Sequence, residues 1–220
     1  MQGFRPLRVK SVEVFFDEGT GSAAEWGSTG RVFISKYVNR SNTDIYEYYL
    51  DGEKIYGMPT PKLRESDRLT KNSAIETEPA LSPDGRYLAL ISDRTGSPQV
   101  YVRDMQRKKL TRITENGNYN VSPSWSPDGK FIAYASRRSG VSSIYRIDPK
   151  SKEENRVTPK NMNAESPTWS PDGSMIAFSG KKGGDWKIYY SLSSGGQAVR
   201  LTNSKAGLQE TMPSWGPSLR

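Results

Sequence analysis

Residues 124–136 have the sequence Ser124-Trp-Ser-Pro-Asp-Gly-Lys-Phe-Ile-Ala-Tyr-Ala-Ser136, and this stretch recurs along the chain. One copy begins at Ala80 and another at Thr168, and a fainter copy begins at Glu25. Ser214-Trp-Gly-Pro217 repeats its start close to the C-terminus. Self-similarity with a period of about 20 to 50 residues is typical of solenoids, propellers and arrays. The repeat therefore decides the fold class.

Three markers measure the period. The first marker of each unit is a Trp or a Leu. The second is an aliphatic-Tyr pair, whose Tyr lies 20 residues after the first marker, and the third is an aliphatic-Thr pair at the end of the unit. The first markers are Trp26, Leu81, Trp125 and Trp169, which gives intervals of 55, 44 and 44 residues. The 11 additional residues of the first unit lie between Tyr46 and Thr70, where we expect an enlarged loop.

Each unit divides into four short strands. The first strand ends at the Trp or Leu marker, and a Pro, which is confined to the starts and edges of strands, precedes the markers at Leu81, Trp125, Trp169 and Trp215. Ser-Pro-Asp-Gly then forms a tight turn, because Pro sets φ, Asp binds its own backbone and Gly accepts positive φ. The second strand follows this turn, the third carries the aliphatic-Tyr pair and the fourth carries the aliphatic-Thr pair. Four strands in about 44 residues predict one blade of a β-propeller.

The chain is thus expected to be all-β, with four four-stranded blades and no second core. The units cover about 24–70, 77–114, 121–158 and 165–202, within a propeller that spans 24–220. Residues 1–23 form an N-terminal extension with one expected strand, between Leu7 and Phe16.

The motif Pro-x-Trp-Ser-Pro-Asp-Gly, followed by Ile-Ala-aromatic, Ile-Tyr and Arg-Leu-Thr, resembles the WD40-like repeat of the TolB β-propeller family. The ending Met212-Pro-Ser-Trp-Gly-Pro217 is also similar to the end of such chains. The resemblance implies a periplasmic, or at least extracytoplasmic, scaffold of the Tol-Pal cell-envelope system. It further implies contact with a peptidoglycan-associated lipoprotein and with a colicin-like ligand.

Two segments compete to be the inner strand of the first blade: the one at Trp26 and the one at Trp215. We predict that the strand at 210–217 pairs beside residues 32–35 and closes a four-bladed ring. The alternative is an open arc that leaves exposed strand edges and completes itself by dimerising. The chain is accordingly expected to be a monomer or a dimer.

The composition limits the chemistry. The chain has no His and no Cys, which excludes catalytic triads with imidazole, cysteine nucleophiles, disulfides and thiolate zinc sites. We expect no enzyme activity, no cofactor and no metal. Residues 1–11 contain no apolar segment of a signal peptide, and no stretch has the length of a membrane span.

Two sets of repeated residues could be taken for sites, but a structural role is the better interpretation. Asp84, Asp128 and Asp172 each lie between Pro and Gly, so we expect them to cap their own turns rather than bind calcium. The repeated Trp residues are expected to pack between adjacent blades rather than stack on a sugar or a base, and these are Trp125, Trp169 and Trp215.

One charge pattern suggests a binding surface. The net charge is +8, which favours acidic partners of any class. Every loop between the second and third strands of a unit carries a cation, and these loops share one face of a propeller. The candidate partner-binding residues are Lys36, Arg40, Arg94, Arg137, Arg138, Lys181, Lys182 and Lys187. Lys71, Lys160 and Lys205, in the connections between units, would lie on the same face.

Three functions are compatible with these features. The favoured one is a non-catalytic scaffold that binds a protein or peptide, possibly acidic, on its loop face or in its channel. The second is a propeller that gates or supports a hydrolase of the peptidase type. The third is a polyanion-binding propeller, for which nucleic acid is the less expected ligand.

Overall fold

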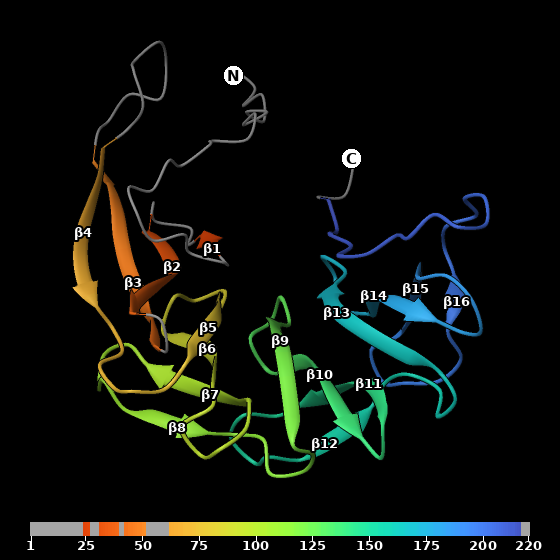
Figure 1. The fold of residues 1–220 in the computed structure, drawn as a ribbon, viewed down its shortest axis with the longest axis horizontal. Helices are drawn as coiled ribbons and strands as arrows, with labels where there is room; N and C mark the ends of the chain where they lie inside the picture. Colours follow the sequence, from red (N-terminus) through yellow and green to blue (C-terminus); the bar gives the residue numbers. More distant parts are fainter. Residues whose placement is uncertain (1–23, 27–30, 40–41, 52–61, 217–220) are drawn as a thin grey trace.

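The computed structural model describes residues 24–26, 31–39, 42–51 and 62–216, and these form sixteen strands in four antiparallel sheets (Figure 1). The expected strand between Leu7 and Phe16 lies outside the described residues. The described part contains no helix that is long and apolar enough to cross a membrane. Each sheet is a simple meander in which sequence neighbours pair, as expected for a propeller blade.

The four sheets follow the four sequence units. The first sheet contains β1 (Ala24–Trp26), β2 (Arg31–Asn39), β3 (Asn42–Asp51) and β4 (Lys62–Arg68). The second contains β5 (Glu76–Leu81), β6 (Tyr87–Ser92), β7 (Gln99–Asp104) and β8 (Leu110–Arg112). The third contains β9 (Tyr119–Trp125), β10 (Ile132–Arg138), β11 (Val141–Ile147) and β12 (Glu154–Arg156). The fourth contains β13 (Asn163–Trp169), β14 (Met175–Lys181), β15 (Lys187–Leu192) and β16 (Val199–Arg200).

The sheets lie face to face along an open arc, with the first and the fourth sheets at its two ends (Figure 1). The predicted closure of the ring by residues 210–217 is not found. β1 occupies the place beside β2 instead, with Trp26 opposite Val32 and Ala24 opposite Ile34. In the described part of the chain, no strand pairing joins residues 210–216 to β2. The physical reason is local: β1 reaches β2 across a short connection, whereas the C-terminal segment packs on the fourth sheet.

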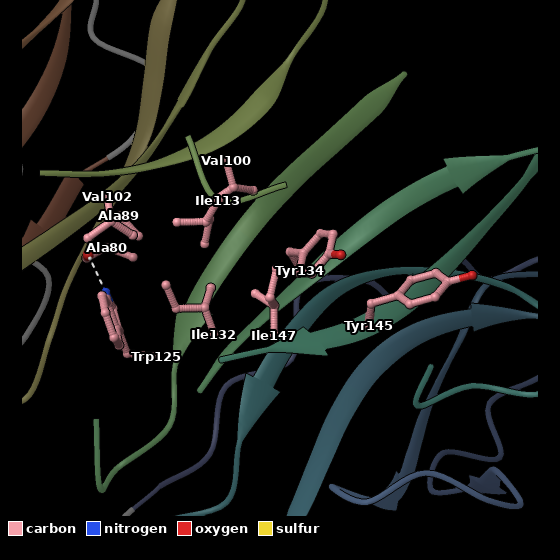
Figure 2. Packing of buried hydrophobic residues seen from close by; sticks show 10 residues of the cluster. All are labelled: Ala80, Ala89, Val100, Val102, Ile113, Trp125, Ile132, Tyr134, Tyr145 and Ile147. Atoms are coloured by element: carbon pink, nitrogen blue, oxygen red, sulfur yellow. Dashed lines mark hydrogen bonds between the residues drawn. The ribbon is translucent and has the colours of Figure 1, made fainter. Parts of the chain in front are cut away.

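The core forms between successive sheets. Figure 2 shows the cluster between the second and third sheets, where Val100 and Ile113 face Ile132. A corresponding cluster between the third and fourth sheets contains Phe178, and one between the first and second contains Phe33. Each sheet thus buries its apolar side chains against a neighbouring sheet, which is why a chain with only 34% hydrophobic residues still forms a core.

Repeated polar contacts hold each blade together. The hydroxyl of Thr114 accepts a hydrogen bond from the Val100 amide at 3.1 Å, and Thr158 accepts one from the Ile144 amide at the same distance. The first and fourth sheets repeat this contact from the amides of Ile45 and Ile188. The aliphatic-Thr marker therefore ties the fourth strand of each blade to the third.

Candidate partner-binding rim

The meander of each sheet places two kinds of connection on one face. The loops between the second and third strands and the connections from one sheet to the next both leave from this face, which we call the rim. The turns between first and second strands and between third and fourth strands lie on the opposite face. The described rim loops are residues 93–98, 139–140 and 182–186, and the connections include 69–75, 113–118 and 157–162.

Three of the predicted rim cations are exposed in the third and fourth sheets. They are Arg137, Lys181 and Lys182. The guanidinium carbon of Arg137 lies 4.7 Å from the ring centroid of Tyr119, a cation-π contact between directly opposite residues of β10 and β9. Tyr119 is itself 38% exposed, so an aromatic ring and a cation are presented together.

Arg138 is held by its own sheet. Its guanidinium makes two hydrogen bonds to the Glu154 carboxylate, at 2.7 and 2.8 Å, and lies 3.8 Å from the ring centroid of Tyr145. Burial opposes ionisation of Glu154, but hydrogen bonds from Arg138 and Tyr134 outweigh it and lower the pKa of this carboxyl. Burial together with the bond to Glu154 raises the pKa of Tyr134. The charge of Arg138 is therefore largely neutralised within the blade.

Arg94 is also paired. Its guanidinium forms an ion pair with Glu76, whose side chain is fully buried, and its Nε donates to the Ser92 hydroxyl at 3.1 Å. The guanidinium further lies 5.3 Å from the ring centroid of Tyr101. An open pocket of about 430 Å³ lies beside Arg94, between the loop 93–98 and the connection 69–75, and is lined also by Asn72 and Asp93. Arg94 lines this pocket, but its charge is compensated by Glu76.

Lys187 differs most from the prediction, because its side chain is buried. The ammonium group donates to the Ser204 hydroxyl and, at 2.7 Å, to the Leu208 carbonyl. It also lies 3.6 Å from the Glu210 carboxylate. Lys187 thus holds the segment that follows β16. The sequence does not indicate this role, because Lys187 looks like any other charged residue of a loop.

Of the remaining predicted loop cations, the structure describes Lys36. The ammonium of Lys36 is 5.3 Å from the ring centroid of Tyr46, and Lys36 is half-buried. Arg40 lies outside the described residues. The connecting lysines Lys71, Lys160 and Lys205 are exposed. Sequence reasoning missed Tyr119, whose position opposite Arg137 is decided by the register of β9 and β10.

The turn aspartates cap their turns, as predicted. In the third sheet, Ser126 donates to Asp128 at 2.7 Å, and Asp128 accepts the Lys130 amide at 3.1 Å. Gly129 has a φ of +69°, which the turn requires and which favours glycine. The bond from the Ser170 hydroxyl and bonds from Ser174 lower the pKa of Asp172 to about 2. Within the described ranges, no three acidic side chains gather into a group that could hold a metal ion.

Trp125 and Trp169 pack between blades, as predicted, whereas Trp215 is half-buried and is bonded only to the fourth sheet. The Trp125 indole N–H donates to the Ala80 carbonyl of the preceding sheet at 3.0 Å, as Figure 2 shows. Trp169 repeats this bond to Ser124 at 2.9 Å. Both side chains are buried.

A family model described as the TolB beta propeller domain matches residues 23–219. The chain belongs to this family. The structure of TolB from Acinetobacter baumannii is similar with a TM-score of 0.74 and 26% identity, over 92% of this chain and 47% of that one. The putative TolB of Agrobacterium tumefaciens is similar with a TM-score of 0.65 and 25% identity, over 84% and 66% of the two chains.

Sequence comparison agrees over a shorter stretch. The Tol-Pal system protein TolB of Bordetella pertussis is 50% identical over 34 residues, which is 16% of this chain and 8% of that protein. The chain spans about half the length of the Acinetobacter TolB structure. A puromycin hydrolase structure has the same fold, with a TM-score of 0.62 and 17% identity over 84% of this chain and 31% of that one.

Proposed function

We propose that this TolB-family propeller is a non-catalytic protein-binding scaffold that holds an acidic peptide segment of its partner on the rim of the third and fourth sheets. The observation that carries the proposal is the exposed pair of Arg137 and Tyr119 at the rim end of the third sheet, together with the exposed Lys181 and Lys182 at the rim end of the fourth. Cations beside an aromatic ring can bind carboxylates while the ring packs on the apolar part of a peptide. Membership of the TolB family supports a protein partner and a periplasmic location for this chain.

The ion pairs that the other predicted cations form within the chain support the rim of the third and fourth sheets as the binding surface. Arg94, Arg138 and Lys187 already have carboxylate partners, so they would have to break ion pairs to bind a ligand. Arg137 and Lys181 lie at the ends of β10 and β14, and Lys182 begins the loop after β14. The exposed Lys160 lies in the connection between the two sheets. An acidic segment lying across these two blades would meet positive charge along its length. The peptidase-type alternative rests on the shared fold alone.

The test is charge reversal on the rim with a matched control on the opposite face. The rim variant is Arg137→Glu/Lys181→Glu/Lys182→Glu, and the control is Arg107→Glu/Lys130→Glu/Lys150→Glu, which makes the same change in net charge. Binding of a fluorescent peptide rich in Asp, Glu and Leu is followed by anisotropy. Because each exposed charge pair contributes about 0.2–1 kcal/mol, we expect the rim variant to bind roughly tenfold more weakly.

The control variant is expected to keep most of the wild-type affinity. Equal loss in the two variants would show that only the overall charge attracts the peptide, which favours a polyanion-binding role. An unchanged affinity in the rim variant would exclude this surface. Repeating the titration with a short DNA duplex distinguishes a peptide site from general attraction to polyanions, since the latter falls steeply with added salt.

A further inference from the structure

A second open pocket lies between the third and fourth sheets, on the face opposite the rim, and we call it the turn pocket. Its volume is about 350 Å³, and it is bounded by the turn that contains Asp128 and the turn that contains Asp172. Phe131, Arg146 and Trp169 also line it. Sites for small molecules in proteins have volumes of about 300–1,000 Å³, so the turn pocket is large enough for a small group.

The turn pocket lies where one side chain departs from the repeat. The position one 44-residue period before Arg146 holds Val102, which belongs to the buried cluster of Figure 2. In that preceding interface, the ring of Tyr87 stacks on Trp125 with the centroids 6.4 Å apart. In the interface with the turn pocket, the guanidinium carbon of Arg146 lies 4.6 Å from the ring centroid of Phe131. A cation thus replaces an apolar residue between two blades.

The blades beside the turn pocket are no farther apart than the preceding pair. A Cβ atom on Gly173 would lie 3.6 Å from Cδ of Pro127, in the turn of the blade before it. A Cβ atom on Gly129 would lie 3.8 Å from Cδ of Pro83, one blade earlier. The turn pocket is therefore shaped by its side chains and not by a wider separation of the turns.

Arg146 has no acceptor for a buried nitrogen. Its Nε is buried without a hydrogen-bond partner within the described ranges, and its guanidinium forms no ion pair with the residues of those ranges. Arg94 and Arg138, by contrast, are paired with Glu76 and Glu154. A guanidinium has five N–H donors, and a buried donor without an acceptor lowers stability. The turn pocket therefore contains a cation that can still bind an acceptor from outside the chain.

The charges around Arg146 favour a carboxylate over a phosphate. The Asp128 carboxylate lies 3.2 Å from the Lys130 ammonium, whereas Asp172 has no ion pair among the described residues. The Ser170 hydroxyl and donors of Ser174 lower the pKa of Asp172 to about 2, so this carboxyl is ionised at neutral pH. Its charge repels a doubly charged phosphate about twice as strongly as a carboxylate. A planar carboxylate also matches the fork of a guanidinium with two parallel hydrogen bonds.

We propose that the turn pocket binds a single carboxylate attached to an apolar group. The carboxylate would lie on the Arg146 guanidinium, and the apolar group would pack on Pro127 and Pro171, which line the same pocket. Both a free small acid and the C-terminal carboxylate of a peptide have this chemistry. The turn pocket and the rim lie on opposite faces, so this site does not depend on the proposed function.

The test uses the two repeated tryptophans as reporters. The Trp169 ring lines the turn pocket and its indole N–H is bonded to Ser124, whereas Trp125 makes the same bond one blade earlier, to Ala80. The ¹⁵N-labelled full chain is titrated with N-acetyl-leucine and, separately, with an acetylated pentapeptide that ends in leucine with a free carboxylate. We expect the indole signal of Trp169 to shift and that of Trp125 to stay. The probe that binds more tightly identifies the source of the carboxylate.

The key variant is Arg146→Val, which introduces the residue found at Val102 in the preceding blade. We expect it to bind the acids at least about tenfold more weakly, because it removes hydrogen bonds to a charged group. An unchanged Trp125 signal and unfolding midpoint will show that it is folded. Arg146→Lys keeps the charge without the fork, and should bind with intermediate affinity. The matched control Lys150→Val removes an exposed charge from the same face and should bind like the wild type.

Three probes and the variants decide between the outcomes. N-acetyl-leucinamide, which lacks the carboxylate, is expected to leave the Trp169 signal unchanged. An equal shift with this amide, or a larger shift with inorganic phosphate than with the acids, would overturn the assignment to a carboxylate. The site itself would be excluded by the absence of a shift with both acids at up to about 10 mM, or by an unchanged affinity of Arg146→Val.

Discussion

At the scale of single residues, the Ser-Pro-Asp-Gly turn shows how a repeated motif can resemble a binding site without being one. Asp172 receives hydrogen bonds from Ser170 and from the Ser174 amide and hydroxyl. These donors are oriented by the turn itself. The acceptor positions of the carboxylate are therefore occupied by residues of the same turn. The same pattern in Asp84 and Asp128 also lowers their pKa values, chiefly through the Ser82 and Ser126 hydroxyls.

The lowered pKa of Asp172 predicts a pH dependence of stability. Its value falls from 3.8 to about 2 on folding, so the ionised form is stabilised in the folded protein. The contribution is fully present above about pH 4 and is lost as the pH falls through about 2. Urea unfolding of the wild type and of Asp172→Asn should therefore differ most near neutral pH, and the difference should shrink between about pH 4 and pH 2. A difference that stays constant over this range would contradict the assignment.

At the scale of elements, β15 both pairs within the fourth sheet and holds the segment that follows β16. Lys187 begins this strand. Its buried ammonium group donates hydrogen bonds to the Ser204 hydroxyl and the Leu208 carbonyl and forms an ion pair with the Glu210 carboxylate. In the second and third sheets, the corresponding positions are held by Gln99 and Ser143, which are neutral. The fourth sheet thus uses a charge to hold residues 204–210 against β15.

The variant Lys187→Met should release this segment. It leaves polar groups near Leu208 and Glu210 without their donor, at a cost of about 1–3 kcal/mol. We expect faster hydrogen exchange at the Glu210 and Met212 amides, with little change in the second and third sheets. Lys181→Met makes the same substitution at an exposed position of the adjoining strand β14, and should leave exchange unchanged. Equal effects of the two substitutions would show that Lys187 does not fasten the segment.

At the scale of the whole molecule, the arc consists of repeated sheets that each pack only on their neighbours. The second and third sheets are covered on both faces, whereas the first and fourth sheets lie at the ends of the arc (Figure 1). Stability in such repeat arrays is approximately the sum of each unit's own stability and its interfaces with its neighbours. The two central sheets therefore have one more interface each than the terminal sheets.

This arrangement predicts a gradient of protection against hydrogen exchange. Amides in β6 and β10 should exchange more slowly than those in β2 and β16 by at least about tenfold, which corresponds to roughly 1.4 kcal/mol of opening free energy. Mass spectrometry of peptic fragments from the monomeric chain at low concentration measures this directly. Uniform protection along the chain would mean that the arc opens as one cooperative unit.

The sequence alone determined the blade count, the four-strand composition of each blade and the roles of the turn aspartates and the tryptophans. These features are local or repeat with a fixed period, so they can be measured by counting residues. The tertiary structure alone decided which cations remain exposed. The ion pairs of Arg94, Arg138 and Lys187 join residues that are 16 to 23 positions apart in the sequence, so only the folded chain brings the partners together. It also decided that β1 rather than the C-terminal segment lies beside β2. Both segments carry the same Trp-Gly signal, and only packing against the fourth sheet distinguishes them.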